Sequence, residues 1–173
     1  IESLAENFCD GVIAPALWYI FFGLPGLFAY KALNTADSMI GHTSERYLDF
    51  GRAAARLDDL ANWLPARISA QLFVGAAWLA KGADPRRARR SMMRDAPMHR
   101  SPNAGWTEAA VAGALGLALN GPRAYGGVVK DDPWMGDGRQ QAEAADIRRA
   151  LVLYLHAAGL FTLVCMVLVW LHR

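Results

Sequence analysis

Residues 11–30 of this chain contain no charged side chain over twenty consecutive positions. A helix rises about 1.5 Å per residue, so a stretch of this length spans the roughly 30 Å hydrocarbon core of a bilayer. The same stretch carries Pro15 and a Gly-Leu-Pro-Gly run at residues 23–26, which interrupt a helix. Such breaks persist at membrane depth only where protein or a cavity satisfies the freed backbone groups. The segment is therefore predicted to be membrane-embedded, either as a kinked span or as a re-entrant hairpin.

A second apolar stretch, residues 150–171, has no charge apart from any proton on His156. It is predicted to be a transmembrane helix with interfacial anchors at both ends. Ionisable residues are rare in lipid, so His156 is a candidate functional residue, although a neutral histidine that bonds to a neighbouring helix is the commoner case. With 54% hydrophobic residues and a mean hydropathy of +0.13, residues 1–173 are predicted to form a single all-α membrane domain.

Between these stretches the chain is expected to form further helices and a turn-rich segment. Residues 31–67 balance acidic and basic side chains and repeat apolar ones at helical spacing, as amphipathic helices at a membrane surface do. Residues 68–80 are apolar but cover only about 20 Å as a helix, which favours a tilted, re-entrant or interfacial helix. Residues 108–119 are predicted to be a short membrane segment whose small side chains suit close helix packing. Residues 120–138 are rich in glycine and proline and are predicted to form turns.

Positive charge is concentrated in residues 81–100, where seven basic side chains stand against two acidic ones and give a local net charge of +5. Under the positive-inside tendency this loop is predicted to be cytoplasmic. The whole chain carries a formal net charge of only +2. A nucleic-acid partner held by a general positive field is therefore not expected.

Acidic and amide side chains form three clusters at helical spacing. Glu2, Glu6 and Asp10 share one helical face, where like charges repel unless a cation relieves them. Carboxylate and amide oxygens suit Mg²⁺, which also binds substrate phosphates, and nearby arginines can hold phosphates bidentately. Solvated ion pairs, or a frayed helix end, explain any single cluster equally well. The other clusters are Asn34 with Asp37, and Asp58, Asp59 and Asn62 beside Arg56 and Arg67.

The turn at residues 99–105 leads into a helix that is expected to begin at Thr107. Backbone N–H groups at a helix start can bind an anion, but ordinary capping explains the turn just as well. The sequence has no P-loop, HExxH zinc motif or GxSxG motif. Its two cysteines, Cys9 and Cys165, form neither a disulfide framework nor a thiolate metal site. Hydrolytic chemistry with a side-chain nucleophile therefore has no support.

Four motifs follow one another along the chain: ESLAENFCDGVIAP, KALNTADSMIGH, RYLDFGRAAARLDDLANWLPAR and HRSPNAGWTEAAVAGALG, with a later YGG. Together they resemble the adenosylcobinamide-phosphate synthase family, the integral membrane enzymes of cobalamin biosynthesis. The motifs cover most of residues 2–127, so the resemblance is far more specific than any one of them. Family members are longer and carry hydrophobic segments before the first motif. This chain is therefore expected to correspond to the C-terminal part of such a protein.

The resemblance implies an ATP-dependent amide ligase that joins adenosylcobyric acid to (R)-1-amino-2-propanol or its O-phosphate. ATP and Mg²⁺ are the implied cofactors, and the corrinoid is a substrate. The implied location is the bacterial cytoplasmic membrane, crossed several times, with the motif loops on the cytoplasmic side. Besides these small molecules, the implied partners are the lipid bilayer and other proteins of the cobalamin pathway.

The positions that match the family motifs carry the expected site roles. Asp37, Asp58 and Asp59 are expected to hold Mg²⁺. Glu2, Glu6 and Asp10 are expected to position or deprotonate the amine, and Lys31 is a further catalytic candidate that faces phosphate. The expected substrate- and phosphate-binding residues are Asn7, Asn34, Arg56, Arg67, Ser101, Asn103, Gly105 and Tyr125.

Two other classes of function stay open at this point. The Asn34-x-x-Asp37 and Asp58-Asp59 patterns superficially resemble Mg²⁺-diphosphate motifs, as in a membrane prenyl- or lipid-diphosphate transferase. A non-enzymatic transporter or assembly subunit would use the charged middle of the chain to dock a partner. A single active site requires all motif groups on one face. This in turn requires that residues 68–80 do not cross the membrane and that residues 11–30 turn back.

Overall fold

The computed structural model describes residues 1–41, 48–125 and 128–171, without the side chains of residues 48–50, 124–125 and 128–129. The expected all-α membrane fold is confirmed, with two helical stretches in the described part, residues 2–40 and 144–171, long and apolar enough to cross a membrane. A π-helical turn, η1 (Cys9–Ile13), joins the first two helices, and a 3-10 turn, η3 (Ala96–Met98), follows the fourth. The helices are α1 (Glu2–Phe8), α2 (Ala14–Ile40), α3 (Leu48–Ala76), α4 (Pro85–Asp95), α5 (Ala104–Leu115) and α6 (Ala144–Leu171).

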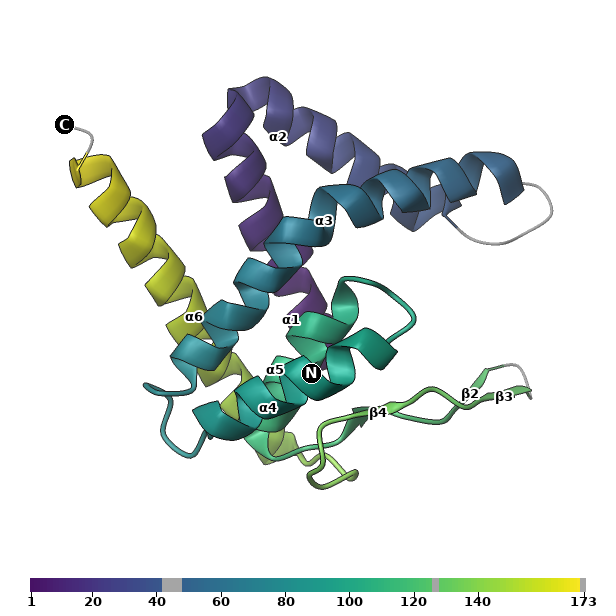
Figure 1. Ribbon diagram of the computed structural model, residues 1–173, viewed down its shortest axis with the longest axis vertical. Coiled ribbons are helices and arrows are strands. Elements are labelled where there is room, and N and C mark those ends of the chain that lie inside the picture. The colour runs from purple at the N-terminus through teal and green to yellow at the C-terminus, as the bar shows by residue number, and fades with distance from the viewer. Residues whose placement is uncertain (42–47, 126–127, 172–173) are drawn as a thin grey trace.

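The first apolar stretch folds as a helical hairpin. At Gly23 the backbone takes φ 65° and ψ −157°, a conformation that side chains other than glycine adopt only under strain. Figure 1 shows the chain rising through α1 and the first part of α2, reversing its direction, and returning along the rest of α2 beside α3. Of the two shapes that the sequence left open, the structure has the one that turns back.

Aromatic contacts between the two arms hold this hairpin closed. The rings of Trp18 and Tyr30 stack with their centroids 6.3 Å apart. A Cβ on Gly26 would lie 2.6 Å from the carbonyl oxygen of Trp18, so only glycine allows the arms to approach this closely. The Tyr30 hydroxyl lies 3.2 Å from the carbonyl oxygen of Asp10 and donates to Oδ1 of Asn62 at 2.9 Å. The same tyrosine therefore fastens both arms to α3.

α3 merges two segments that the sequence analysis treated separately. It runs for 29 residues, from the amphipathic stretch into the apolar one, and ends at Ala76. Residues 77–82 then form turns, so the apolar stretch 68–80 is not an independent helix. Likewise residues 31–40 complete α2 and do not start a new surface helix. The reason is that no helix-terminating signal separates these stretches. Pro65 is accommodated within α3, where the Ser69 hydroxyl donates to its carbonyl oxygen at 2.8 Å.

α5 is the centre of the fold, and its residues 107–115 are all buried. A Cβ on Gly113 would lie 2.5 Å from the carbonyl oxygen of Arg87, so the predicted close packing of small residues is confirmed, with α4 as the partner. The helix begins at Ala104, earlier than the predicted Thr107. The Ser101 hydroxyl oxygen accepts from the N–H of Ala104, the first residue of the helix, at 3.2 Å.

Four short strands lie in residues 119–135, which overlap the segment 120–138 that is predicted to form turns. β1 (Leu119–Asn120) pairs antiparallel with β4 (Trp134–Met135), and β2 (Arg123–Tyr125) pairs with β3 (Val128–Lys130). In Figure 1 these strands form one long ribbon below α3, beside α4 and α5. The glycines and prolines that predicted turns lie between the strand pairs and at their ends. The ribbon supplies one wall of the site described below.

α6 packs against the rest of the fold through its N-terminal part, as far as Phe161. The Phe8 ring lies 4.7 Å from the Phe73 ring and 5.1 Å from the Tyr154 ring, which joins α1, α3 and α6 in one core. Beyond residue 162 the large apolar side chains of α6 are mostly exposed, up to 73% for Trp170. His156 is half-buried, and its Nδ1 lies 2.8 Å from the carbonyl oxygen of Val152 in the same helix. The part of α6 beyond residue 162 is the part suited to lipid.

Candidate functional site

Two adjoining cavities lie where the arms of the hairpin meet α3 and the turn before α5. The larger cavity has a volume of about 740 Å³ and the smaller cavity about 220 Å³. Glu6 from α1, Asp37 from α2, Asp59 from α3 and Ser101 from the turn line both. Each of these residues comes from a different sequence motif. The hairpin is what brings Glu6 and Asp37 together across the long apolar stretch that separates them in sequence.

The wall formed by α1 carries the three predicted carboxylates on one face. Glu2 and Glu6 line the larger cavity, whereas Glu6 and Asp10 line the smaller one. The carboxylate of Glu2 is bonded to the strand ribbon. It accepts from the Asn120 N–H at 2.8 Å and pairs with the Arg123 guanidinium. Glu6 is therefore the carboxylate of this wall that stands between the two cavities.

The wall formed by α2 and α3 holds a second carboxylate group. Asp58 is 8% exposed, and its two oxygens accept from the amides of Asn34 at 3.3 Å and Asn62 at 2.9 Å. Asp59 is half-buried and faces the cavities. Burial, followed by the charges of Asp58 and Asp37, raises the pKa of Asp59. A bound cation would relieve this repulsion between carboxylates.

The donor set of this wall fits Mg²⁺ in one particular form. Within the described residues, no group of three or more His, Cys, Asp or Glu side chains is arranged to hold a metal ion. Mg²⁺ usually takes one or two protein carboxylates and completes its shell with water and substrate phosphate. Asp37 and Asp59 match that requirement, with oxygen ligands beside open volume. Asp58, whose oxygens already bond to two amides, fits a role in positioning its neighbour.

The turn that contains Ser101 and Asn103 is tied directly to the acidic wall. Asn103 Nδ2 donates to the backbone oxygen of Asp59 at 2.8 Å and to its Oδ1 at 3.3 Å. Arg67 donates to Asn103 Oδ1 at 3.3 Å, and its guanidinium lies between the rings of Trp63 and Trp106, 4.2 and 4.8 Å from their centroids. Arg67, expected to face phosphates, therefore instead holds the turn in place.

Several other predicted residues lie away from both cavities. Asn7, Lys31 and Arg56 are exposed and line neither of them, since they occupy other faces of helices whose acidic faces do. Lys31 Nζ donates to Asn34 Oδ1 at 3.2 Å. Gly105 is buried, and a Cβ there would lie 2.8 Å from the carbonyl oxygen of Ala96, so it permits close packing. The side chain of Tyr125 lies outside the described part of the chain.

Sequence reasoning missed Glu108, the most deeply buried carboxylate of the larger cavity. Its residue is 3% exposed, and Oε2 has no hydrogen-bond partner among the described atoms. Burial, followed by the charges of Glu6 and Glu2, raises the pKa of Glu108 to about 8. One signal could have identified it, because it is the only acidic residue between positions 96 and 130 and stands in a run of small apolar side chains. The other charged or titratable residues that line this cavity and were not predicted are His99, Arg100, Arg123, Lys130 and Asp132.

This chain is similar to a known protein family and to several named proteins. A family model described as CobD/Cbib protein matches residues 1–154, which include every residue that lines the two cavities. Proteins named "Cobalamin biosynthesis protein CobD" from Brucella suis biovar 1 (strain 1330) and Rhizobium meliloti (strain 1021) are 57% identical over 164 residues, 94% of this chain and 50% of each relative. One from Rhodobacter capsulatus is 50% identical over 166 residues, 95% of this chain and 51% of the relative. The chain thus spans about half the length of these curated relatives. No solved structure matches it.

Proposed function

This chain belongs to the CobD/Cbib protein family, and from that premise we propose that it is part of an ATP-dependent amide ligase of cobalamin biosynthesis. The proposed reaction joins the free carboxylate of adenosylcobyric acid to (R)-1-amino-2-propanol or its O-phosphate. The observation that carries the proposal is the shared lining of the two cavities, where Glu6, Asp37, Asp59 and Ser101 meet from four separate motifs. Relatives named for cobalamin biosynthesis support the pathway.

The chemistry of amide formation explains why such a cavity is needed. A carboxylate resists attack by an amine because its oxygen is a very poor leaving group. Transfer of a phosphoryl group from ATP to the carboxylate provides a good one, and positive charge must then stabilise the phosphoryl oxygens during transfer. A site of this kind needs cations for the phosphates, carboxylates for the amine, and enclosed volume. At about 740 Å³ the larger cavity has the size of an ordinary small-molecule site.

Residues of the two cavities divide naturally between these tasks. Asp37 and Asp59 would hold Mg²⁺, which supplies charge neutralisation at the phosphates when it is bound. Arg100 and Lys130 both line the larger cavity, opposite the acidic wall of α1, and are the cations that we assign to phosphate. They take the place of Arg56, which lies outside the cavities, and of Arg67, which holds the turn. Asp58 positions Asp59 and the two amides around it.

The proposed location is the cytoplasmic face of the bacterial cytoplasmic membrane, where the other proteins of the pathway are potential partners. The +5 charge of residues 81–100 supports this orientation, and so does the convergence of both hairpin ends on one site. Single-cysteine variants Arg56→Cys and Arg100→Cys, labelled in intact cells and in inverted vesicles, test it. Both positions should react only in inverted vesicles. Labelling of the two positions from opposite sides contradicts a shared active site.

The decisive experiment uses the full-length protein purified in lipid nanodiscs. With ATP, Mg²⁺, adenosylcobyric acid and (R)-1-amino-2-propanol or its O-phosphate, wild-type protein should form the corrinoid amide, detected by mass spectrometry. Asp59→Asn should lower kcat at least about 100-fold, because the metal and phosphates lose a ligand. Asp131→Asn, an exposed carboxylate outside both cavities, is the matched control and should behave as wild type. Absence of ATP-dependent amidation by wild type, or turnover of an isoprenoid diphosphate in its place, refutes the proposal.

A further inference from the structure

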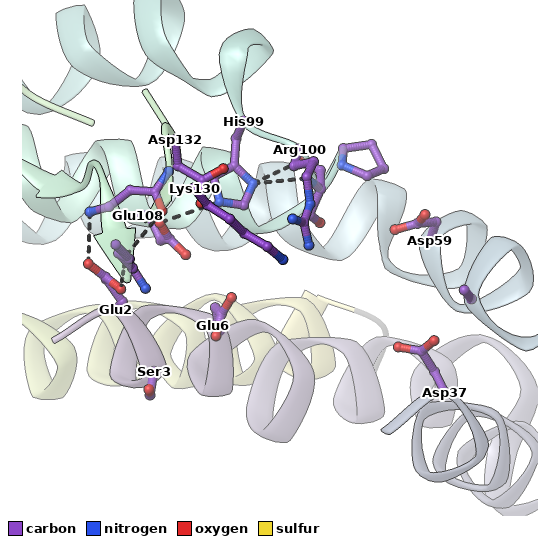
Figure 2. A pocket seen from close by; sticks show the side chains of 15 residues that line it. Glu2, Ser3, Glu6, Asp37, Asp59, His99, Arg100, Glu108, Lys130 and Asp132 are labelled. Atoms are coloured by element: carbon purple, nitrogen blue, oxygen red, sulfur yellow. Dashed lines mark hydrogen bonds and ion pairs between the residues drawn. The ribbon is translucent and has the colours of Figure 1, made fainter. Parts of the chain in front are cut away.

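Glu108 presents a buried carboxylate oxygen without a hydrogen-bond partner to the larger cavity. Its side chain is 4% exposed, and the cavity is the open volume that it borders. Leaving such an oxygen unsatisfied destabilises the fold, and more so when the group is charged, so a native fold seldom retains one without a use. Figure 2 shows Glu108 pointing from α5 toward Glu2 and Glu6 on α1, with His99 beside it.

Neighbouring donors do not satisfy this oxygen. Nε2 of His99 lies 3.7 Å from Glu108 Oε2, which is too far for a hydrogen bond. The backbone N–H of Ser101 donates to His99 Nδ1 at 3.0 Å, so Nδ1 acts as an acceptor and the neutral ring carries its proton on Nε2. Arg123, the guanidinium on the strand wall, pairs with Glu2. Glu6 and Glu108 therefore form a carboxylate pair at the cavity. The side chains that line this cavity carry more negative than positive charge.

The chemistry of this pair selects the kind of ligand. A primary ammonium group is a compact cation with three N–H donors, and two carboxylates on opposite walls can each accept one of them. The cavity is also wide enough for the rest of a small amine.

We propose that Glu6 and Glu108 bind the protonated amino group of a small primary amine, and that Glu108 then accepts one of its protons as the general base of amide formation. This inference rests on the proposed function for its reaction step but not for its binding step. The raised pKa of Glu108 is consistent with the role, since a base works best when its pKa is near the working pH.

Protons and bonds balance in the reaction step. The ammonium nitrogen gives one proton to the Glu108 carboxylate and becomes a neutral amine with a lone pair. That lone pair forms the new C–N bond at the phosphorylated carboxyl carbon, while the C–O bond to phosphate breaks. The second N–H proton leaves with the phosphate, and Glu108 returns its own proton to solvent. Glu2, Glu6, His99 and Arg123 are the titratable or charged groups that face Glu108 and modulate this transfer.

Binding is tested first, without ATP or corrinoid. Isothermal titration of the full-length protein with (R)-1-amino-2-propanol, in two buffers of different ionisation enthalpy, reports affinity and proton release at pH 7. Wild type should bind the amine and release a proton, because the ammonium group displaces the proton held by Glu108. It should not bind 1,2-propanediol, which has a hydroxyl in place of the amine. Glu108→Gln should weaken amine binding at least about 10-fold and abolish the proton release.

Kinetics then separate a base from a merely structural residue. In wild type kcat/KM for the amine should fall as the pH drops below about 8, with a slope of one proton. Glu108→Gln should lower kcat about 100-fold or more and remove that limb of the profile, and Glu108→Asp should restore part of the rate. Asp131→Asn should keep the wild-type profile.

Each outcome decides between the two claims. If wild type makes no corrinoid amide but still binds the amine through Glu108, the proposed ligase function fails and the amine site stands. If wild type makes the amide and both Glu108→Gln and Glu6→Gln keep the wild-type affinity and pH profile, the amine site is refuted and the ligase function stands. The two variants are independent, so poor folding of one leaves the other to decide.

Discussion

The hairpin of residues 2–40 and helix α6 are similarly apolar, yet they do different work. The most apolar 18-residue stretch has a mean hydropathy of 1.8 in the hairpin and 2.3 in α6. Each of the two segments is long enough to cross a membrane. The hairpin is broken at Gly23, and both of its ends, at Glu6 and Asp37, reach the same cavities. α6 is unbroken and brings no side chain to either cavity. Hydropathy therefore identifies which segments suit lipid, whereas a single backbone break decides which of them builds a site.

The largest effect is expected from restoring a side chain at the break. Gly23→Ala places a Cβ at φ 65° and ψ −157°, so the hairpin should lose about 3 kcal/mol of stability or straighten. Either result separates Glu6 from Asp37, and amidation by the full-length protein should become undetectable. Thermal unfolding in detergent and the amidation assay measure the two effects.

The matched control is Gly159→Ala in α6. Gly159 lies in a regular helix, and a Cβ there would meet no atom within 4 Å. Alanine is a better helix former than glycine, so the variant should be as stable as wild type or up to about 1 kcal/mol more stable. Equal losses at both glycines would remove the contrast between the broken and the unbroken helix.

A smaller effect is expected from pH, because the hairpin sets Glu6 and Glu2 against Glu108. The pKa of Glu108 is raised from 4.5 to about 8 in the folded protein, so the folded state holds its proton more tightly than the unfolded state does. The resulting stabilisation is fully present below pH 4.5 and is lost as the pH rises through about 8. On the order of 3 kcal/mol should therefore disappear between pH 5 and pH 8. Denaturation at a series of pH values measures this loss. Glu108→Gln should flatten the plot of unfolding free energy against pH, whereas Asp131→Asn should leave it unchanged.

The ion pair between the first arm and the strand ribbon should contribute less. Arg123→Gln or Glu2→Gln breaks this half-buried ion pair and should cost about 1–2 kcal/mol. At the start of α6, Glu143→Gln removes a 70% exposed partner of Arg139 and should cost less than about 0.5 kcal/mol. A double-mutant cycle on Glu2 and Arg123 isolates their coupling energy. A coupling near zero would mean that the ribbon is held to the hairpin by other contacts.

The smallest effect is expected at His156 in α6. Among the described residues its ring bonds only to the carbonyl oxygen of Val152 in its own helix, and it lines neither of the two cavities. His156→Leu should change neither the rate of amidation nor, by more than about 0.5 kcal/mol, the stability of the protein. A clear loss of amidation in this variant would show that α6 contributes more than an anchor.

The acidic part of the site was accessible to sequence reasoning because helical spacing is a local property. Glu2, Glu6 and Asp10 share a face whatever surrounds them, and Asp37 and Asp59 were found in the same way. The basic part was not accessible, because an arginine or lysine can reach in several directions. Arg67 turned out to stack between two tryptophans, whereas Arg100 and Lys130 line the larger cavity. Only the packed neighbours decide between such directions.

Local sequence was sufficient for the helical membrane fold, the family and the break within residues 11–30, because each depends on composition, order or a glycine and a proline in one short window. The packed fold alone decided that this break turns the chain back, because the closing contacts join Trp18 to Tyr30 and Tyr30 to Asn62 across long sequence separations. It also decided that Glu108 is buried beside Glu6. A buried carboxylate acquires its charge state from groups far away in sequence, and no local pattern encodes them.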